Sequence, residues 1–170
     1  MSNWHGLLKV LEFTQTRNGE IVTQFKDLKN LLHSDGESFI LQACFFGGQT
    51  SSIIPDNYYL GLDNRESIDV ADTMVSLSGE PIGNGYARQA ISSAGSFVVA
   101  FTNTHYVATS PIVSFQATGT SWGPVNNLFL TTETDATGFL ISSVILPQAV
   151  TVLAGDLVTL RTALSLKDCT

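Results

Sequence analysis

The strongest constraint on the fold is a series of short apolar runs that follow one another from Pro81 to the C-terminus. Each run has the length and residue content of a β-strand, and turn-forming residues separate one run from the next. Strands that recur at intervals of about ten residues, with no helix between them, predict an antiparallel sandwich or barrel rather than a βαβ sheet. The runs are YARQAIS, SFVVAF, YVATSPIVSFQAT, VNNLFLTT, GFLISSVIL and DLVTLRTALSL.

The first 56 residues predict a β-hairpin followed by a short helix. Asn18 and Gly19 lie between the partly alternating runs LLKVLEFTQT and EIVTQFKDL, and Asn-Gly in that setting is the strongest short-range hairpin signal. A helix over 36–46 is indicated by the capping-box spacing of Ser34 and Glu37, by apolar residues at helical intervals and by the glycine pair that follows.

The segment between these two regions predicts one more strand, NYYLGLDN, and a turn or two of helix that Asp69 or Asp72 can cap. The predicted fold is therefore mainly β: an antiparallel, jelly-roll-like sandwich over 57–170, with an N-terminal β-hairpin and one or two short helices. The hairpin and first helix, over 1–56, either pack on the sandwich or extend from it.

Charge and composition exclude several classes of function. Charged residues make up 14% of the chain and its net charge is −7. The few basic residues are scattered, which excludes nucleic acid and anionic membrane surfaces as partners. The longest apolar stretches, such as FILQACFF, are too short to cross a bilayer. The start of the chain lacks the pattern of a secretory signal, so we expect synthesis and folding in a cytoplasm.

No pattern of residues predicts catalysis, a cofactor or a metal site. The chain has no GxSxG motif, and His5, His33 and His105 lie in unrelated contexts, so each is interpreted as a solvated or hydrogen-bonded structural side chain. Cys44 and Cys169 form neither a disulfide framework nor a zinc spacing, and Cys44 is predicted to be a buried thiol. The sequence therefore predicts a non-enzymatic protein.

Other chemistry-bearing residues also have structural interpretations. The acidic residues of 63–72 match no calcium-binding loop and are interpreted as solvated helix caps. Gly83 and Gly85 predict a turn with positive φ rather than a phosphate loop, because a strand follows and a third glycine is missing. Arg88, in that strand, is expected to pair with an acidic neighbour or with a partner chain.

Several motifs follow one another over residues 57–162: YYLGL, ADTMVSLSGEP, GNGYARQAI, VSFQATGTSWGPVNNLFLTT, GFLISSVIL and LAGDLVTLR. This order resembles a family of small structural proteins in the virions of tailed bacteriophages. In that family a glycine turn that ends in tyrosine leads into an ARQ strand, a Trp-Gly-Pro corner precedes an apolar strand, and a Gly-Asp turn introduces the last strand. The longer segment VVAFTNTHYVATSPIV departs from the family pattern.

The resemblance implies a virion structural protein without catalytic residues. The function expected first is that of a capsid cement or decoration protein, which binds the major capsid protein on the capsid exterior and stabilises adjacent subunits. The alternative within the same class is a tail, collar or baseplate component, including a fibre attachment, bound to tail proteins. Symmetric assembly would hide strand edges, so we expect a homo-oligomer, with a trimer favoured.

The residues chosen as partner contacts are Trp4, Leu8 and Phe13 in the N-terminal hairpin, together with Arg88. Trp4 can equally close the core of the domain. No catalytic, cofactor-binding or metal-binding residue is predicted.

A carbohydrate-binding module is the alternative from a different class, because β-sandwiches also bind sugars through exposed aromatic side chains. At least two such side chains on one exposed concave face would favour it, and burial of most of them would remove it. The candidates are Trp122, Tyr58, Tyr59, Tyr86 and Tyr106.

Overall fold

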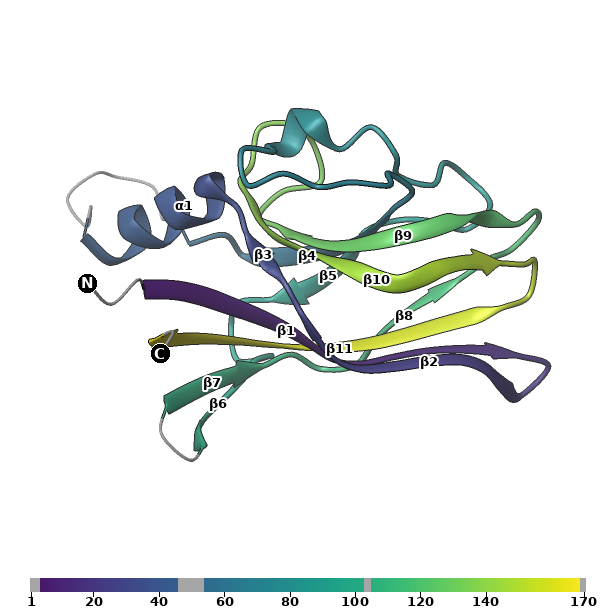
Figure 1. Ribbon diagram of the computed structural model, residues 1–170, viewed down its shortest axis with the longest axis horizontal. Coiled ribbons are helices and arrows are strands. Elements are labelled where there is room, and N and C mark those ends of the chain that lie inside the picture. Colours follow the sequence, from purple (N-terminus) through teal and green to yellow (C-terminus); the bar gives the residue numbers. More distant parts are fainter. Residues whose placement is uncertain (1–3, 46–53, 103–104, 169–170) are drawn as a thin grey trace.

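The computed structural model describes residues 4–45, 54–102 and 105–168. Its described residues form eleven strands, one α-helix and one single-turn 3-10 helix (Figure 1). In chain order these are β1 (Trp4–Arg17), β2 (Glu20–Lys29), β3 (Leu31–Leu32), α1 (Ser34–Phe45), β4 (Asn57–Asp63), η1 (Met74–Ser76), β5 (Gln89–Ser92), β6 (Val98–Thr102), β7 (His105–Thr109), β8 (Val113–Gln116), β9 (Trp122–Thr131), β10 (Leu140–Val152) and β11 (Leu157–Asp168).

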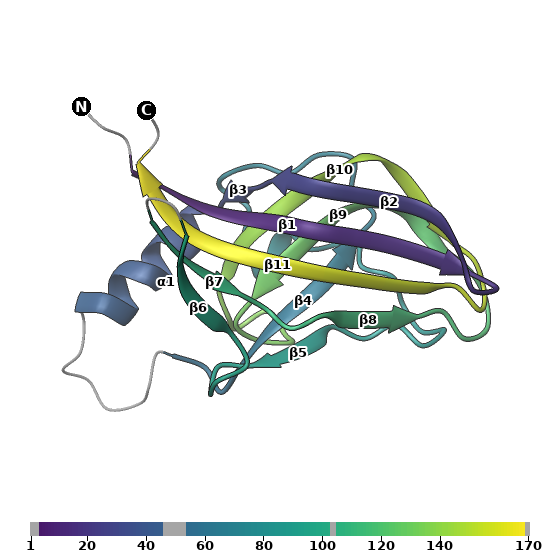
Figure 2. The same cartoon turned by 90° about the horizontal axis from the view of Figure 1, so that it is seen from below.

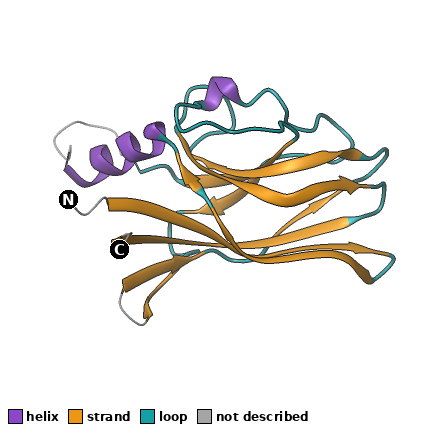
Figure 3. Ribbon diagram, viewed as in Figure 1, coloured by secondary structure: helices purple, strands orange, loops and turns teal. Residues whose placement is uncertain are grey.

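The strands make two antiparallel sheets that face each other, so the predicted β-sandwich is confirmed (Figures 1 and 3). The six-stranded sheet has the order β2-β1-β11-β7-β6, and β8 also pairs with β11. The five-stranded sheet has the order β3-β10-β9-β4-β5. The finer prediction of a jelly roll is not confirmed by this arrangement.

The predicted N-terminal hairpin is confirmed, and it is built into the six-stranded sheet. Arg17 lies opposite Glu20, and Asn18 and Gly19 have φ of 53° and 86°, the backbone of a two-residue hairpin turn. β1 pairs with β11 over almost its full length, as Figure 2 shows. The first and last strands of the chain therefore lie side by side, and the hairpin does not extend away from the sandwich.

Helix α1 closes one end of the sandwich. It begins at Ser34 and ends at Phe45, close to the predicted bounds, and Phe39 on it is buried in the core. The backbone N–H of Glu37 donates to the carbonyl of His33. Cys44 is exposed, so its predicted burial is wrong, because the last turn of the helix extends past the ends of the sheets (Figure 1).

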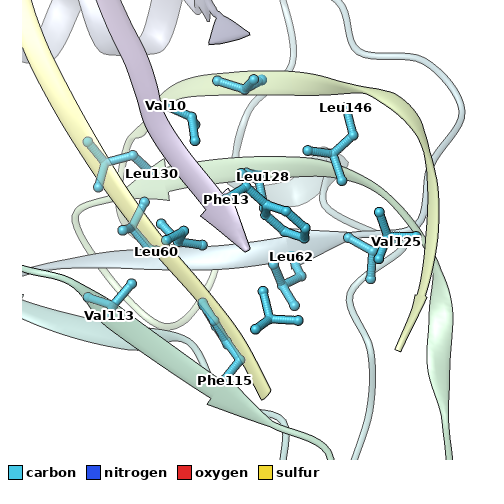
Figure 4. Close-up of a cluster of buried hydrophobic side chains, with 14 of the residues drawn as sticks. Val10, Phe13, Leu60, Leu62, Val113, Phe115, Val125, Leu128, Leu130 and Leu146 are labelled. Carbon is cyan, nitrogen blue, oxygen red and sulfur yellow. The ribbon is translucent and has the colours of Figure 1, made fainter. Parts of the chain in front are cut away.

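The core lies between the inner faces of the two sheets, where apolar side chains from both layers interdigitate (Figure 4). Trp122 belongs to this core and begins β9, so the Trp-Gly-Pro sequence starts a strand instead of forming a corner before it. The predicted strand YVATSPIVSFQAT is divided into β7 and β8 around Pro111, which cannot donate a ladder hydrogen bond. Neither of the two described helices has the length and hydropathy of a membrane span.

Candidate functional site

The β6–β7 hairpin is the least enclosed part of the six-stranded sheet. β7 pairs with β11 only over Ala163–Ser165, and β8 pairs with the earlier part of β11. β6 pairs with β7 and forms the outermost strand. Figures 1 and 2 show this hairpin at the same end of the molecule as α1, and it forms the edge of the six-stranded sheet opposite to β2.

This hairpin exposes large apolar side chains in an unusual concentration. All five residues of β6 are exposed. The exposed fractions are 62% for Val98, 65% for Val99, 62% for Phe101 and 67% for Tyr106. We call these four residues the hairpin surface. Contiguous exposed apolar side chains of this kind mark interaction sites more often than isolated ones do.

Three residues of the hairpin surface continue the core-facing side of the sheet. Phe101 lies opposite Tyr106, and Val99 lies opposite Ala108. The two rings of the first pair are 5.2 Å apart in an edge arrangement. Ala108 is in turn opposite Leu164, which packs against the core. Val99, Phe101 and Tyr106 therefore lie on the face of the sheet that carries the core residues, but their side chains remain exposed.

An apolar cavity of about 200 Å³ lies next to this side of the hairpin, between α1 and the two sheets. Aromatic rings make up much of its wall, and Tyr58 meets both Phe39 and Phe97 edge-on. Burial raises the pKa of Tyr58. The wall is formed by Phe39, Ile40, Tyr58, Phe97, Ala108, Leu130, Ile141 and Leu164. The sandwich is thus less completely filled at this end.

The opposite, outward face of the sheet carries a groove of about 430 Å³. Its wall is formed by Lys9, Leu11, Thr102, His105, Val107, Thr109, Ala163 and Ser165. Lys9 is paired with Asp27 at 2.6 Å, and most of the other side chains in the wall are hydroxyl-bearing or apolar. The groove therefore offers mainly hydroxyl and apolar contacts.

Charge is absent from the stretch of sequence that contains the hairpin surface. Between residues 89 and 132 the sequence contains no Asp, Glu, Lys or Arg. Natural edge strands are usually protected by charged side chains, proline, bulges or short length. Strand β6, with the sequence VVAFT, contains no charged residue and no proline, and that signal in the sequence could have identified the candidate site.

Arg88 lies at a different place and is a structural residue of the sandwich. Its guanidinium is 2.6 Å from Glu80 Oε2 and lies over the Phe129 ring, 5.2 Å from the centroid. Its Nη1 donates to the carbonyl of Glu133. The Tyr86 hydroxyl donates to Glu80 at 2.7 Å, and burial raises the pKa of Tyr86. Of the two expected partners for Arg88, the acidic neighbour is therefore the one present.

Within its described residues, the structure assigns no exposed contact surface to the N-terminal residues that were chosen as partner contacts. Phe13 is 0% exposed and stacks on Phe25 with centroids 5.6 Å apart, so its side chain belongs to the core and offers nothing to a partner. The backbones of Trp4 and Leu8 lie in β1 opposite Asp168 and Leu164. Their side chains lie outside the described residues.

The acidic residues of 63–72 are more buried than predicted. Asp63 is 1% exposed and pairs with Arg65 at 2.6 Å, and Arg65 also contacts Asp72 at 3.0 Å. The interpretation of these carboxylates as solvated caps is therefore wrong for Asp63 and Asp72. Asp69 accepts the N–H of Ala71 in an exposed turn, as a local cap does.

His33 is a fully buried, hydrogen-bonded histidine, which confirms the structural interpretation. Its Nδ1 is 2.8 Å from the carbonyl oxygen of Asp69, and its Nε2 is 2.7 Å from Ser143 Oγ. Because a carbonyl only accepts, Nδ1 carries the proton and Nε2 accepts from the hydroxyl. Burial lowers the pKa of His33, so the ring is held in its neutral form.

The five aromatic residues considered for sugar binding do not gather on one exposed face. Trp122 is buried, and its indole N–H donates to the carbonyl of Asn84. Tyr58, Tyr59 and Tyr86 are partly buried. Tyr106 is the one exposed member of this set. The condition set for a carbohydrate-binding module is not met by these side chains.

Comparison with known proteins adds no family assignment. No family model matches the chain, and no curated protein matches it significantly.

Proposed function

We propose that this chain is a non-enzymatic structural protein that attaches to a larger protein assembly through the hairpin surface. The observation that supports it most directly is an outermost strand with exposed apolar side chains on both faces and no charge. Val99, Phe101 and Tyr106 would fill the centre of such a contact, where charged residues are normally depleted and aromatic residues enriched. Thr and His side chains beside them would form its polar rim.

The assembly we propose is the virion of a tailed bacteriophage, as the resemblance of the motif order implies. In this proposal the chain is a capsid cement or decoration protein, made in the host cytoplasm, that binds the major capsid protein on the capsid exterior. A tail, collar or baseplate component is the alternative within the same class.

The energetics suit attachment in many copies. Complete burial of one exposed Phe or Val side chain contributes about 1.5–3 kcal/mol before the costs of association are subtracted. Three or four such side chains give a weak contact for one isolated copy. When neighbouring copies are held on one surface, their effective concentration is high and their contacts reinforce each other. Stabilisation of adjacent subunits follows from that arrangement.

Quantitative mass spectrometry of purified virions tests this function, with the major capsid protein as the reference. A copy number comparable with that of the capsid protein is expected. A count of a few to a few dozen copies per particle would move the proposed position of the protein from the capsid to the tail or collar. Absence from the particle would overturn the virion role.

A further inference from the structure

We infer that strand β6 is an edge at which a second copy of this chain pairs, antiparallel, about a twofold axis at Ala100. This inference rests on the proposed function, because it names a second copy of the chain as one partner of the β6–β7 hairpin that the proposed attachment uses. The pairing would join two six-stranded sheets into one continuous sheet. It uses the backbone edge of β6, whereas the attachment proposed above uses the apolar side chains on its faces.

The first argument is that β6 is the least protected edge among the described strands. β2, at the other edge of the same sheet, carries Glu20, Lys26, Asp27 and Lys29, and Asp27 has a positive φ of 57°. In the other sheet, β3 has two residues and β5 has four. β8 has four residues and follows a proline by two positions. Charge, irregular backbone and short length are the devices that normally prevent edge pairing.

The second argument is that β6 is complementary to itself. Within the described residues it has ladder hydrogen bonds with β7 alone, so the other edge of its backbone is available to a second strand. With Ala100 on the axis, Val99 lies opposite Phe101 of the second copy, and Val98 lies opposite Thr102. Each pair joins a β-branched residue with an aromatic or β-branched one, which stabilises antiparallel strands. The small side chain of Ala100 meets its own copy at the centre.

The third argument is electrostatic. Each chain has a net charge of −7, so two copies repel each other at most relative orientations. Residues 89–132 contain no Asp, Glu, Lys or Arg, so a contact made by residues of this segment places no like charges directly opposite each other. The remaining repulsion acts over a distance and is screened by salt. The pairing is therefore expected to strengthen as the salt concentration rises.

The size of the contact sets its strength. A contact in which one five-residue strand pairs with its own copy buries far less than the roughly 1,600 Å² of a standard interface. The dimer is therefore weak and concentration-dependent in free solution, and more stable where an assembly holds copies together. A twofold contact of one edge with itself closes after two copies, so this edge produces a dimer and not the trimer favoured from sequence.

Disulfide trapping tests the register. In a chain carrying Cys44→Ser and Cys169→Ser, an added Ala100→Cys places two thiols on directly opposed residues, whose Cα atoms lie about 4.5–5.5 Å apart in an antiparallel pair. This distance suits a disulfide. Thr102→Cys in the same background is the matched control, because its two copies would be about 13 Å apart along the strands. Under mild oxidation the first variant is expected to form a covalent dimer and the second to stay monomeric.

Charge substitution tests the pairing independently of any thiol. Ala100→Lys and Ala100→Asp each place like charges opposite each other, and each variant alone is expected to dimerise more weakly than the unmodified chain in sedimentation equilibrium at the same salt concentration. An equimolar mixture of the two is expected to dimerise more strongly than either variant alone at that salt concentration, since opposite charges then meet. Circular dichroism checks that each variant is folded.

The pairing is overturned if the unmodified chain keeps a monomer mass at all concentrations and Ala100→Cys does not cross-link, or if Thr102→Cys cross-links equally well. A trimer mass would overturn the twofold contact too. These results are independent of the virion measurement. If the chain is a monomer but abundant in particles, only the pairing proposal is refuted. If it is a dimer but absent from particles, only the virion role is refuted.

Discussion

At the scale of single residues, the Asp156 carboxylate fixes one end of the strand pair that β1 and β11 form. It is fully buried and accepts hydrogen bonds from Arg17 Nε and Nη2 at 2.8 and 2.9 Å. Gln15 Nε2 donates to it at 2.7 Å, and the N–H of Leu153 donates at 2.8 Å. The end of β1 is thereby attached to the turn that leads from β10 into β11.

Asp156→Asn is expected to lower the free energy of unfolding by about 2 kcal/mol at neutral pH, because a neutral amide cannot accept the paired bonds of a guanidinium. The hydrogen bonds from Arg17 hold the pKa of Asp156 at about 2, below the roughly 3.9 of an unfolded aspartate. The stability that the ionised Asp156 carboxylate contributes is therefore fully present above about pH 5 and is lost as the pH falls towards 2. Denaturant titrations of both proteins at several pH values measure it, and a difference that persists unchanged in acid would contradict it.

His33 gives a pH dependence in a different range. Burial lowers its pKa, whereas an unfolded histidine titrates near about 6.5. Below that pH the unfolded chain binds a proton that the folded chain does not, so the stability is expected to fall as the pH drops. Melting temperatures of the unmodified chain and of His33→Gln, measured across this range, should show a smaller slope for the variant. His105→Gln is the control, and equal slopes in all three proteins would refute the assignment.

At the scale of the elements, two phenylalanines of the six-stranded sheet have opposite environments. Phe13 in β1 is fully buried and Phe101 in β6 is 62% exposed. Phe13→Ala is expected to cost about 3–5 kcal/mol of unfolding free energy, as a cavity in a packed core does. Phe101→Ala should cost less than about 1 kcal/mol, since it loses only the edge contact with Tyr106. Denaturant midpoints of the two variants measure the contrast, and similar losses in both would show that the hairpin is enclosed.

Local sequence patterns predicted most of the elements but not how they are combined. Asn18-Gly19 specifies its turn through φ alone, so the hairpin could be predicted from two residues. Arg88 precedes β5 directly, and Glu80 lies eight positions earlier in the loop after η1, so their pairing depends on the tertiary fold. The same holds for β1 with β11, at opposite ends of the sequence, because periodicity gives the faces of a strand and not its neighbours.

The candidate site was predicted only in general terms. The sequence indicated a weakly charged β-domain that contacts other chains, but Phe13 was chosen as a contact because it is large and apolar. Its alternation with the polar residues of β1 is equally typical of a core position, and the pairing of β1 in the middle of the sheet decides between the two. The uncharged segment 89–132 was the more specific signal.

At the scale of the whole molecule, the features of the candidate site are grouped at one end. The hairpin surface, the cavity and α1 lie together there (Figure 1), and Leu41 and Phe45 on α1 are also exposed. The opposite end is closed by Asp156 and its partners. This grouping is suited to attachment through that end in a fixed orientation.

Co-sedimentation with purified virions tests the central claim most directly, because it asks whether the hairpin surface attaches the chain to the particle. Phe101→Lys places a charge on that surface, and Val22→Lys places the same charge on the exposed β2 edge as a control. The unmodified chain and Val22→Lys are expected to sediment with particles that lack the protein, and Phe101→Lys is expected to remain in solution. Equal binding of all three proteins would show that another surface makes the contact, and binding of none would contradict the proposed function itself.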